Sequence, residues 1–200
     1  MDDQSPIRSV RDFLLQLLTI TAGVLIALLL EGLVGWNQNR VLVNEAKATI
    51  RREIADNREA LDKHLKGVEE RSRDLENTLT WATERLKTGK SDLKVSIGFS
   101  ASPLSTAAWE TAARTGALAH MKYSDVQKYA NLYSVQALYT AGQLRTLERV
   151  TSAISLAGDD VTPKEMEVLH QEVLHLRGDL FMVLEIGKGL SAAYGDLLKE

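Results

Sequence analysis

The chain has 200 residues, of which 44% are hydrophobic and 26% charged, and its formal net charge is −3 at pH 7. This balance gives no electrostatic basis for nucleic-acid binding, which requires a basic face. Cysteine is absent, which excludes disulfides, thiolate catalysis and zinc sites with cysteine ligands.

The first predicted element is a transmembrane helix over residues 13–36, preceded by a tail of residues 1–12. Residues 13–30 carry no charged side chain, and apolar residues resume at Leu33 and Val34. A helix over residues 13–34 would be about 33 Å long, which matches the hydrocarbon core of a bilayer. Trp36 lies where an aromatic interfacial anchor is expected. The alternatives are a cleaved signal peptide, for which the stretch is too long and lacks an Ala-x-Ala site, and a buried soluble helix.

Flanking charges bear on the orientation of this span. Arg8 and Arg11 precede it, and several basic residues follow it between residues 40 and 52. A bare count favours a cytoplasmic C-terminal side, but long domains cross the membrane largely regardless of charge. A short tail with two arginines before a span is typical of a signal anchor with its N-terminus inside. We therefore expect a single-span protein of the bacterial inner membrane with a periplasmic soluble domain.

One face of the span carries small and polar residues, whereas its other faces carry leucine, isoleucine and valine. At intervals of four, this stripe contains Thr19, Gly23, Ala27, Glu31 and Gly35. Four residues advance a helix by about 400°, so the stripe drifts slowly. Small residues let helix backbones approach closely, and polar groups in lipid prefer a protein neighbour. The stripe predicts association with a second copy or another membrane helix; the alternative is chance placement in a lone anchor.

Residues 37–200 are predicted to form an all-α domain of antiparallel hairpins, and the span is expected to continue into a long helix over residues 37–88. The seam of this helix steps by four and three residues, with one stutter, as in a coiled coil. Its members are Val43, Lys47, Ile50, Ile54, Asn57, Leu61, His64, Val68, Ser72, Leu75, Leu79, Ala82 and Leu86. Polar members make the seam imperfect; Asn57 and His64 suit hydrogen bonding inside a bundle, or a role in register or pH sensing.

After a loop over residues 89–102, Ser102-Pro103 predicts a short helix over residues 103–114, closed by Gly116. Ser124-x-x-Gln127 resembles a capping box and predicts the start of a helix over about residues 125–157. One side of that helix is predicted to carry Val126, Tyr129, Tyr133, Ala137, Leu144, Leu147 and Ile154. Its tyrosines, with Trp109, suit a core better than a ligand cleft.

The last helix follows an N-terminal signal at Thr162-Pro163-x-Glu165. Its apolar seam is regular and contains Met166, Leu169, Val173, Leu176, Leu180, Val183, Gly187, Leu190, Tyr194 and Leu197.

Motifs that carry chemistry are weak in this chain. Two Glu-x-x-His units end at His170 and His175 on one helix, about 140° apart, so they cannot form the facing ligand pairs of a di-iron bundle. Gly89-Lys90-Ser91 resembles the end of a phosphate-binding loop but lacks its first glycine. We therefore expect no catalytic, cofactor or metal site, and no enzyme.

Four short segments resemble a group of uncharacterised single-span bacterial membrane proteins with a helical domain. They are Gly-Val-Leu-Ile-Ala-Leu at residues 23–28, Gly-Trp-Asn-Gln-x-Arg at 35–40, Arg-x-Glu-Ile-x-x-Asn at 51–57 and Ala-Ala-Trp-Glu-Thr-Ala-x-x-Thr-Gly-Ala-Leu at 107–118. The resemblance implies the same topology and no activity, because the function of that group is unknown.

These features favour a membrane-anchored helical scaffold or accessory subunit that acts through protein–protein contact. Its expected partners are the lipid bilayer and either a second copy or another membrane protein. A periplasmic ligand-sensing bundle is the alternative; it is less favoured because this sequence contains no second span and no output domain.

Overall fold

The computed structural model describes residues 10–93, 95–157 and 161–199, and within these ranges the fold is all-α, as predicted. Its elements are α1 (Val10–Thr88), α2 (Ala107–Arg114), the short 3₁₀ helix η1 (Ala117–His120), α3 (Tyr123–Leu156) and α4 (Pro163–Lys199). The prediction that one helix runs through the apolar segment and on to Thr88 is confirmed.

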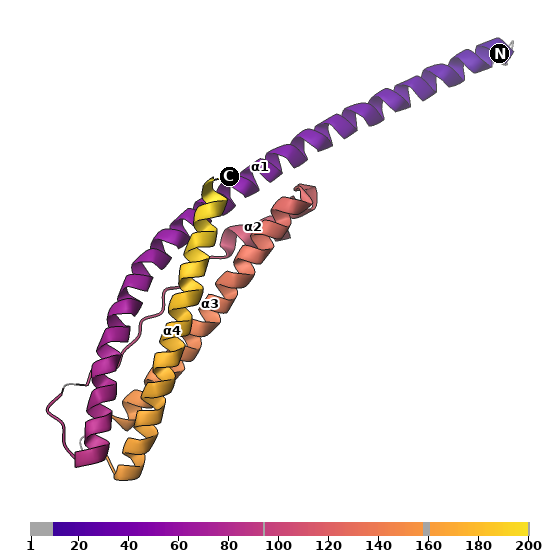
Figure 1. The fold of residues 1–200 in the computed structure, drawn as a ribbon. Helices are drawn as coiled ribbons and strands as arrows, with labels where there is room; N and C mark the ends of the chain where they lie inside the picture. The colour runs from indigo at the N-terminus through magenta and orange to yellow at the C-terminus, as the bar shows by residue number, and fades with distance from the viewer. Residues whose placement is uncertain (1–9, 94, 158–160, 200) are drawn as a thin grey trace.

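The N-terminal part of α1 projects well beyond the bundle formed by the other helices (Figure 1). It is long and apolar enough to cross a membrane, and none of its most hydrophobic stretch is buried by the rest of the chain. Leu18 and Leu29, for example, are 66% and 68% exposed. The alternative of a helix buried in this chain's own core is therefore excluded.

Helix α4 is the central element of the bundle, since it packs against both α1 and α3. Its predicted seam is confirmed: Met166, Leu169, Val173, Leu176, Leu180, Val183, Gly187, Leu190 and Tyr194 are all buried, and Leu197 is partly buried. On α1 the buried face includes Ile50, Ile54, Leu61, Val68, Leu75 and Ala82, also as predicted. Leu86, at the end of that predicted seam, is 37% exposed.

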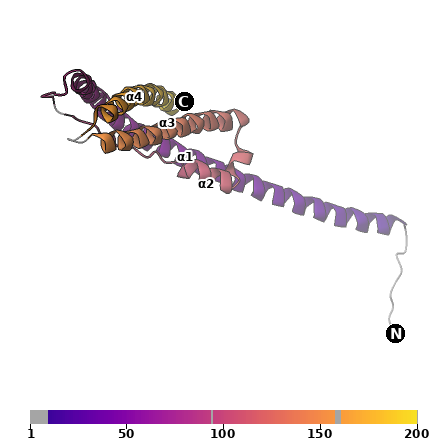
Figure 2. The same ribbon diagram turned by 90° about the horizontal axis from the view of Figure 1, so that it is seen from below.

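An extended segment lies between α1 and α3 over part of their length. Residues 95–106, here named the strap, run between these helices before α2 begins (Figures 1 and 2). The predicted helix start at residue 103 is therefore wrong. The backbones of Ser102 and Ser105 are bonded to side chains of α3 and α1, which holds them extended and delays the helix to Ala107.

Two other predicted boundaries need correction. Lys122 is the N-cap of α3, which begins at Tyr123. The capping box predicted at Ser124 therefore does not start this helix. The turn at Gly116 is confirmed, with φ at 77°, but it leads into η1, which the sequence analysis did not predict. A left-handed φ favours glycine because it has no Cβ to clash with the backbone.

The start of α4 is stabilised as its sequence signal predicts. The backbone N–H of Thr162 donates to Glu165 Oε2 at 2.9 Å, and the backbone N–H of Glu165 donates to Thr162 Oγ1 at 3.3 Å. These reciprocal bonds satisfy two N–H groups that the first turn of a helix leaves unpaired. Hydrogen bonds from Thr162 also lower the pKa of the Glu165 carboxyl group.

The buried face of α3 differs from the prediction. Tyr129 and Tyr133 are buried as expected, but Leu144, Leu147 and Ile154 are 55%, 40% and 53% exposed. Polar residues take their place in the interior, namely Gln136, Gln143 and Thr146. The strap explains this exchange in part, because its backbone N–H and C=O groups need hydrogen-bonding partners on the helix that covers it.

Candidate functional site

The predicted association stripe lies on the projecting part of α1. Thr19, Gly23, Ala27 and Glu31 are exposed and Gly35 is partly covered. Apart from the adjoining residues of the same helix, no described residue comes within 4 Å of a Cβ built on Gly23 or Gly35. The hydroxyl of Thr19 donates to the carbonyl oxygen of Leu15 at 2.9 Å, inside its own helix. The structure therefore leaves this face open along the span.

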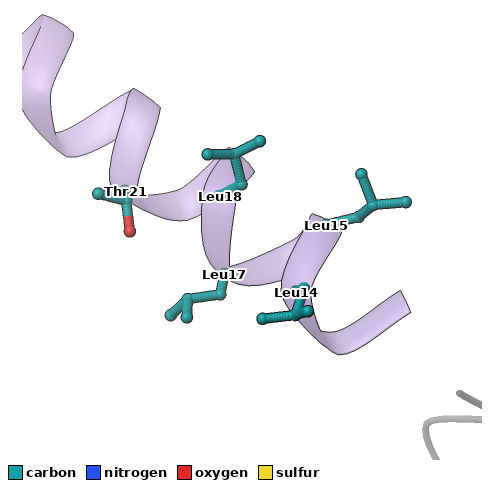
Figure 3. Close-up of a pocket in the computed structure, with 5 residues that line it drawn as sticks. All are labelled: Leu14, Leu15, Leu17, Leu18 and Thr21. Atoms are coloured by element: carbon teal, nitrogen blue, oxygen red, sulfur yellow. The ribbon is translucent and has the colours of Figure 1, made fainter. Parts of the chain in front are cut away.

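A hollow on the same part of α1 is lined by Leu14, Leu15, Leu17, Leu18 and Thr21. Figure 3 shows these side chains pointing outward from a single helix with no second wall opposite them. An apolar ligand is bound when a pocket covers most of its surface. This hollow therefore does not by itself form a ligand site.

The described residues bring a second set of polar side chains together in the interior, where the strap lies between α1 and α3. Asn57 Nδ2 donates to the carbonyl oxygen of Ser105 at 2.8 Å, and the Ser105 N–H donates to Asn57 Oδ1 at 2.8 Å. Gln136 Nε2 on α3 donates to the same carbonyl at 2.9 Å. Asn57 and Gln136 are almost fully buried, so these bonds are shielded from water.

The same two-way pairing recurs further along the strap. The Ser102 N–H donates to Gln143 Oε1 at 2.7 Å, and Gln143 Nε2 donates to the Ser102 carbonyl oxygen at 3.2 Å. Near the far end of the bundle, the Ser96 N–H donates to Thr78 Oγ1 at 3.2 Å. In each pairing, a side chain forms hydrogen bonds with the strap backbone that the backbone of a neighbouring strand would form in a β-sheet.

His64 on α1 connects the strap to α3. Its Nε2 lies 2.5 Å from the carbonyl oxygen of Ser100, and its Nδ1 lies 2.6 Å from the hydroxyl oxygen of Tyr139. A carbonyl only accepts, so Nε2 carries the proton and Nδ1 can accept from Tyr139 in the neutral ring. Burial lowers the pKa of His64, and the bond to Ser100 opposes this effect in part.

Glu53 on α1 holds the start of α2 against the bundle. Its Oε2 accepts from the Ser105 hydroxyl at 2.5 Å and from the Ala108 N–H at 2.9 Å, while its Oε1 accepts from the Tyr133 hydroxyl at 2.6 Å. A carboxylate at a helix N-terminus is favoured by the helix dipole and the unpaired N–H groups there. Burial and the neighbouring Glu53 carboxylate both raise the pKa of Tyr133.

Trp109, one residue beyond this contact, stacks on Tyr133 with ring centroids 5.4 Å apart and planes inclined by 17°. Two segments that carry the family resemblance, residues 51–57 and 107–118, are therefore in direct contact through Glu53 and Ala108. Sequence patterns alone did not predict that Glu53, Gln136 and Gln143 lie in the interior. The available signal was the Glu-Ile-x-x-Asn pattern, which repeats polar groups at helical spacing on an otherwise apolar face.

The polar side chains in this part of the interior mainly bind the backbone of the strap. The amides, the hydroxyls and the one carboxylate among them bind the strap, α2 or each other; Tyr194, for instance, donates to Gln136 Oε1 at 2.5 Å.

Among the described residues, the two histidines of the Glu-x-x-His units do not form a metal site. His170 Nε2 lies 3.3 Å from Thr83 Oγ1, and His175 is exposed. Within the part of the chain that the structure describes, no group of three or more His, Asp or Glu side chains could hold a metal ion.

The chain matches no protein-family model, and no curated protein or solved structure resembles it significantly. The fold and its contacts therefore carry the functional argument.

Proposed function

We propose that this protein is a single-span membrane protein that acts as a helical scaffold or accessory subunit through protein–protein contact. The observation that carries the proposal is the projecting half of α1, which is apolar on most faces and open along its small-residue stripe. The same helix continues without interruption into the bundle. A partner bound in the membrane would therefore be mechanically coupled to the soluble domain.

Exposed apolar side chains on the bundle support the same proposal. Leu138 on α3 is 57% exposed, and Phe181 and Met182 on α4 are 61% and 57% exposed. Aromatic residues and methionine are enriched at protein interfaces. We propose a location in a bacterial inner membrane with the bundle in the periplasm, because Arg8 and Arg11 lie on the N-terminal side of the span and long domains cross the membrane largely regardless of charge.

Replacement of Gly23 tests the stripe. Gly23→Ile adds a branched side chain to a face that needs close helix approach, while isoleucine keeps the span as apolar as before. We expect membrane crosslinking of the full-length chain, to itself or to a partner, to fall strongly. Val24→Ile, on a neighbouring face, is the matched control and should crosslink like the parent. Equal crosslinking by the parent and both variants would show that the stripe has no role in association and that the span is only an anchor.

A further inference from the structure

A cleft with basic walls lies at the end of the bundle from which the projecting part of α1 emerges. Trp36, Arg40 and Lys47 on α1 form one wall, and His120 and Lys122 at the junction of η1 and α3 form the other. Figures 1 and 2 show this junction beside α1, near the point where the helix leaves the bundle. Two elements distant in sequence therefore shape the cleft next to the span.

The Arg40 side chain in this cleft is directed toward the span. Along an α-helix the Cα–Cβ bonds tilt toward the N-terminus, which here is the membrane side. Arg40 follows this rule, since its Cζ lies 5.6 Å from the ring centroid of Trp36, one turn closer to the span. One turn is about 5 Å, close to the depth of one headgroup layer. With Trp36 at the interface, the Arg40 guanidinium lies among headgroups.

Most of the charged side chains that line this region are basic. A neighbouring hollow shares Lys47 with the cleft and adds Arg51, Lys128 and Asp125. Lys47 donates to Asp125 at 2.5 Å, and this bond, ahead of the other nearby lysines, lowers the pKa of Asp125. Asp125 is the one carboxylate among the residues that line the two hollows, against Arg40, Lys47, Arg51, Lys122 and Lys128.

We propose that the cleft between residues 36–47 of α1 and residues 120–122 binds the phosphate headgroup of an anionic phospholipid. The proposal rests on the membrane anchor of the proposed function. Arginine and lysine side chains bind phosphate oxygens through charge-assisted hydrogen bonds. A zwitterionic headgroup fits less well, because the same cations repel its choline or ethanolamine group. The bound lipid would fix the bundle close to the bilayer surface through both α1 and α3.

Native mass spectrometry of the full-length chain in detergent tests this site. Phosphatidylglycerol and phosphatidylcholine with identical acyl chains are added in equal amounts. We expect phosphatidylglycerol adducts to predominate. The double variant Arg40→Gln/Lys122→Gln should lose about tenfold or more of this preference, since each basic residue near an anionic surface contributes roughly fivefold in affinity. Arg40→Lys/Lys122→Arg, which keeps both charges, should retain most of it.

The matched control removes one charge from the opposite end of α1 and one from the loop just beyond it. Lys87→Gln/Lys90→Gln should bind phosphatidylglycerol like the parent, and circular dichroism should show the same helicity for all variants. Equal adducts of both lipids on the parent, or equal losses in the two double variants, would overturn the proposal. Displacement of the lipid by millimolar glycerol 3-phosphate would instead assign the cleft to a soluble phosphate compound. Release of the chain from membranes by carbonate would refute the membrane anchor of the proposed function. That result is distinct from equal binding of the two lipids, which would refute only the lipid site.

Discussion

Glu53, on α1, is the carboxylate on which contacts from the strap, α2 and α3 converge. Glu53→Gln keeps the size of the side chain but replaces one acceptor oxygen with an N–H donor that faces other donors. We expect the free energy of unfolding to fall by about 1–3 kcal/mol, the usual cost of leaving a buried polar group unsatisfied. Denaturant unfolding of the full-length chain in detergent, followed by circular dichroism, measures the change.

The control for that substitution is Glu59→Gln, on the exposed side of the same helix. It changes the charge equally and should leave stability almost unchanged, within about 0.5 kcal/mol. A Glu53→Gln variant as stable as the parent would show that the three bonds to this carboxylate contribute little.

His64 gives the bundle a pH dependence with a definite sign. The pKa of His64 in the folded chain lies below its ordinary value of 6.5, because burial disfavours the charged imidazolium. The unfolded chain therefore binds more protons, and stability falls as the pH drops through and below 6.5. The midpoint of thermal unfolding should decrease more between pH 7.5 and pH 5.5 for the parent than for His64→Gln.

Two features make this comparison specific. The shifted carboxyl groups of Asp125 and Glu165 have lowered pKa values, so both stay ionised throughout that pH range. His175→Gln, at an exposed position, should keep the pH dependence of the parent. If His64→Gln loses as much stability on acidification as the parent, then another group titrates.

At the scale of the elements, Gly187 allows α4 to approach both of its neighbours. A Cβ at this position would lie 2.5 Å from Leu65 Cδ2 and 2.9 Å from Tyr139 Cε2, closer than such atoms can come. Gly187→Ala should therefore force the Leu65 and Tyr139 side chains to move from their packed positions and destabilise the bundle by about 1–3 kcal/mol.

Gly189, two residues further along α4, supplies the matched control. A Cβ there meets nothing within 4 Å, so Gly189→Ala should stabilise the helix by about 0.5–1 kcal/mol through its higher helix propensity. Opposite signs for the two alanine variants in denaturant unfolding are the expected result. The same sign for both would mean that α4 does not pack closely at Gly187.

The elements differ in how far the sequence predicts them, and the reason is the kind of neighbour each one has. The seam of α4 is predicted almost completely because this helix packs against apolar faces of two other helices, and apolar spacing reports such contacts. Helix α3 instead covers the strap with Gln136 and Gln143, which helical periodicity assigns to solvent. Only the fold reveals that a backbone lies opposite these amides.

The same limit applies to the candidate sites. The stripe of small and polar residues can be identified from the sequence because four-residue spacing on one helix is a local property; its role in association stays a prediction. The lipid cleft cannot, since Arg40 and Lys122 lie far apart in the chain and meet only through the path of the strap, α2 and η1. For the same reason the contact between Glu53 and Ala108 joins two segments that the sequence presents as separate motifs.

At the scale of the whole molecule, one rigid helix links the span to the bundle, so the side of the membrane on which the bundle lies can be tested at one exposed loop. Helix α1 ends at Thr88, and Gly89 adopts a left-handed φ of 73°. Lys90 is exposed just beyond it, whereas parts of the strap are bonded to α1 and α3. The strap contains no lysine or arginine and so offers trypsin no site, whereas Lys87 and Lys90 are exposed; trypsin should therefore cut near residues 87–90.

We expect trypsin added to intact spheroplasts to cleave the chain near residues 87–90, because the proposed orientation exposes the bundle on the periplasmic face. The expected products are an N-terminal fragment that stays with the membrane and a C-terminal fragment that includes α3 and α4. Lys87→Gln/Lys90→Gln, the same pair that serves as the lipid-binding control, should slow this cut without changing the orientation. Protection of the parent in spheroplasts, with cleavage only after lysis, would place the bundle in the cytoplasm. The lipid cleft would then face the inner leaflet, and its geometry relative to the span would be unchanged.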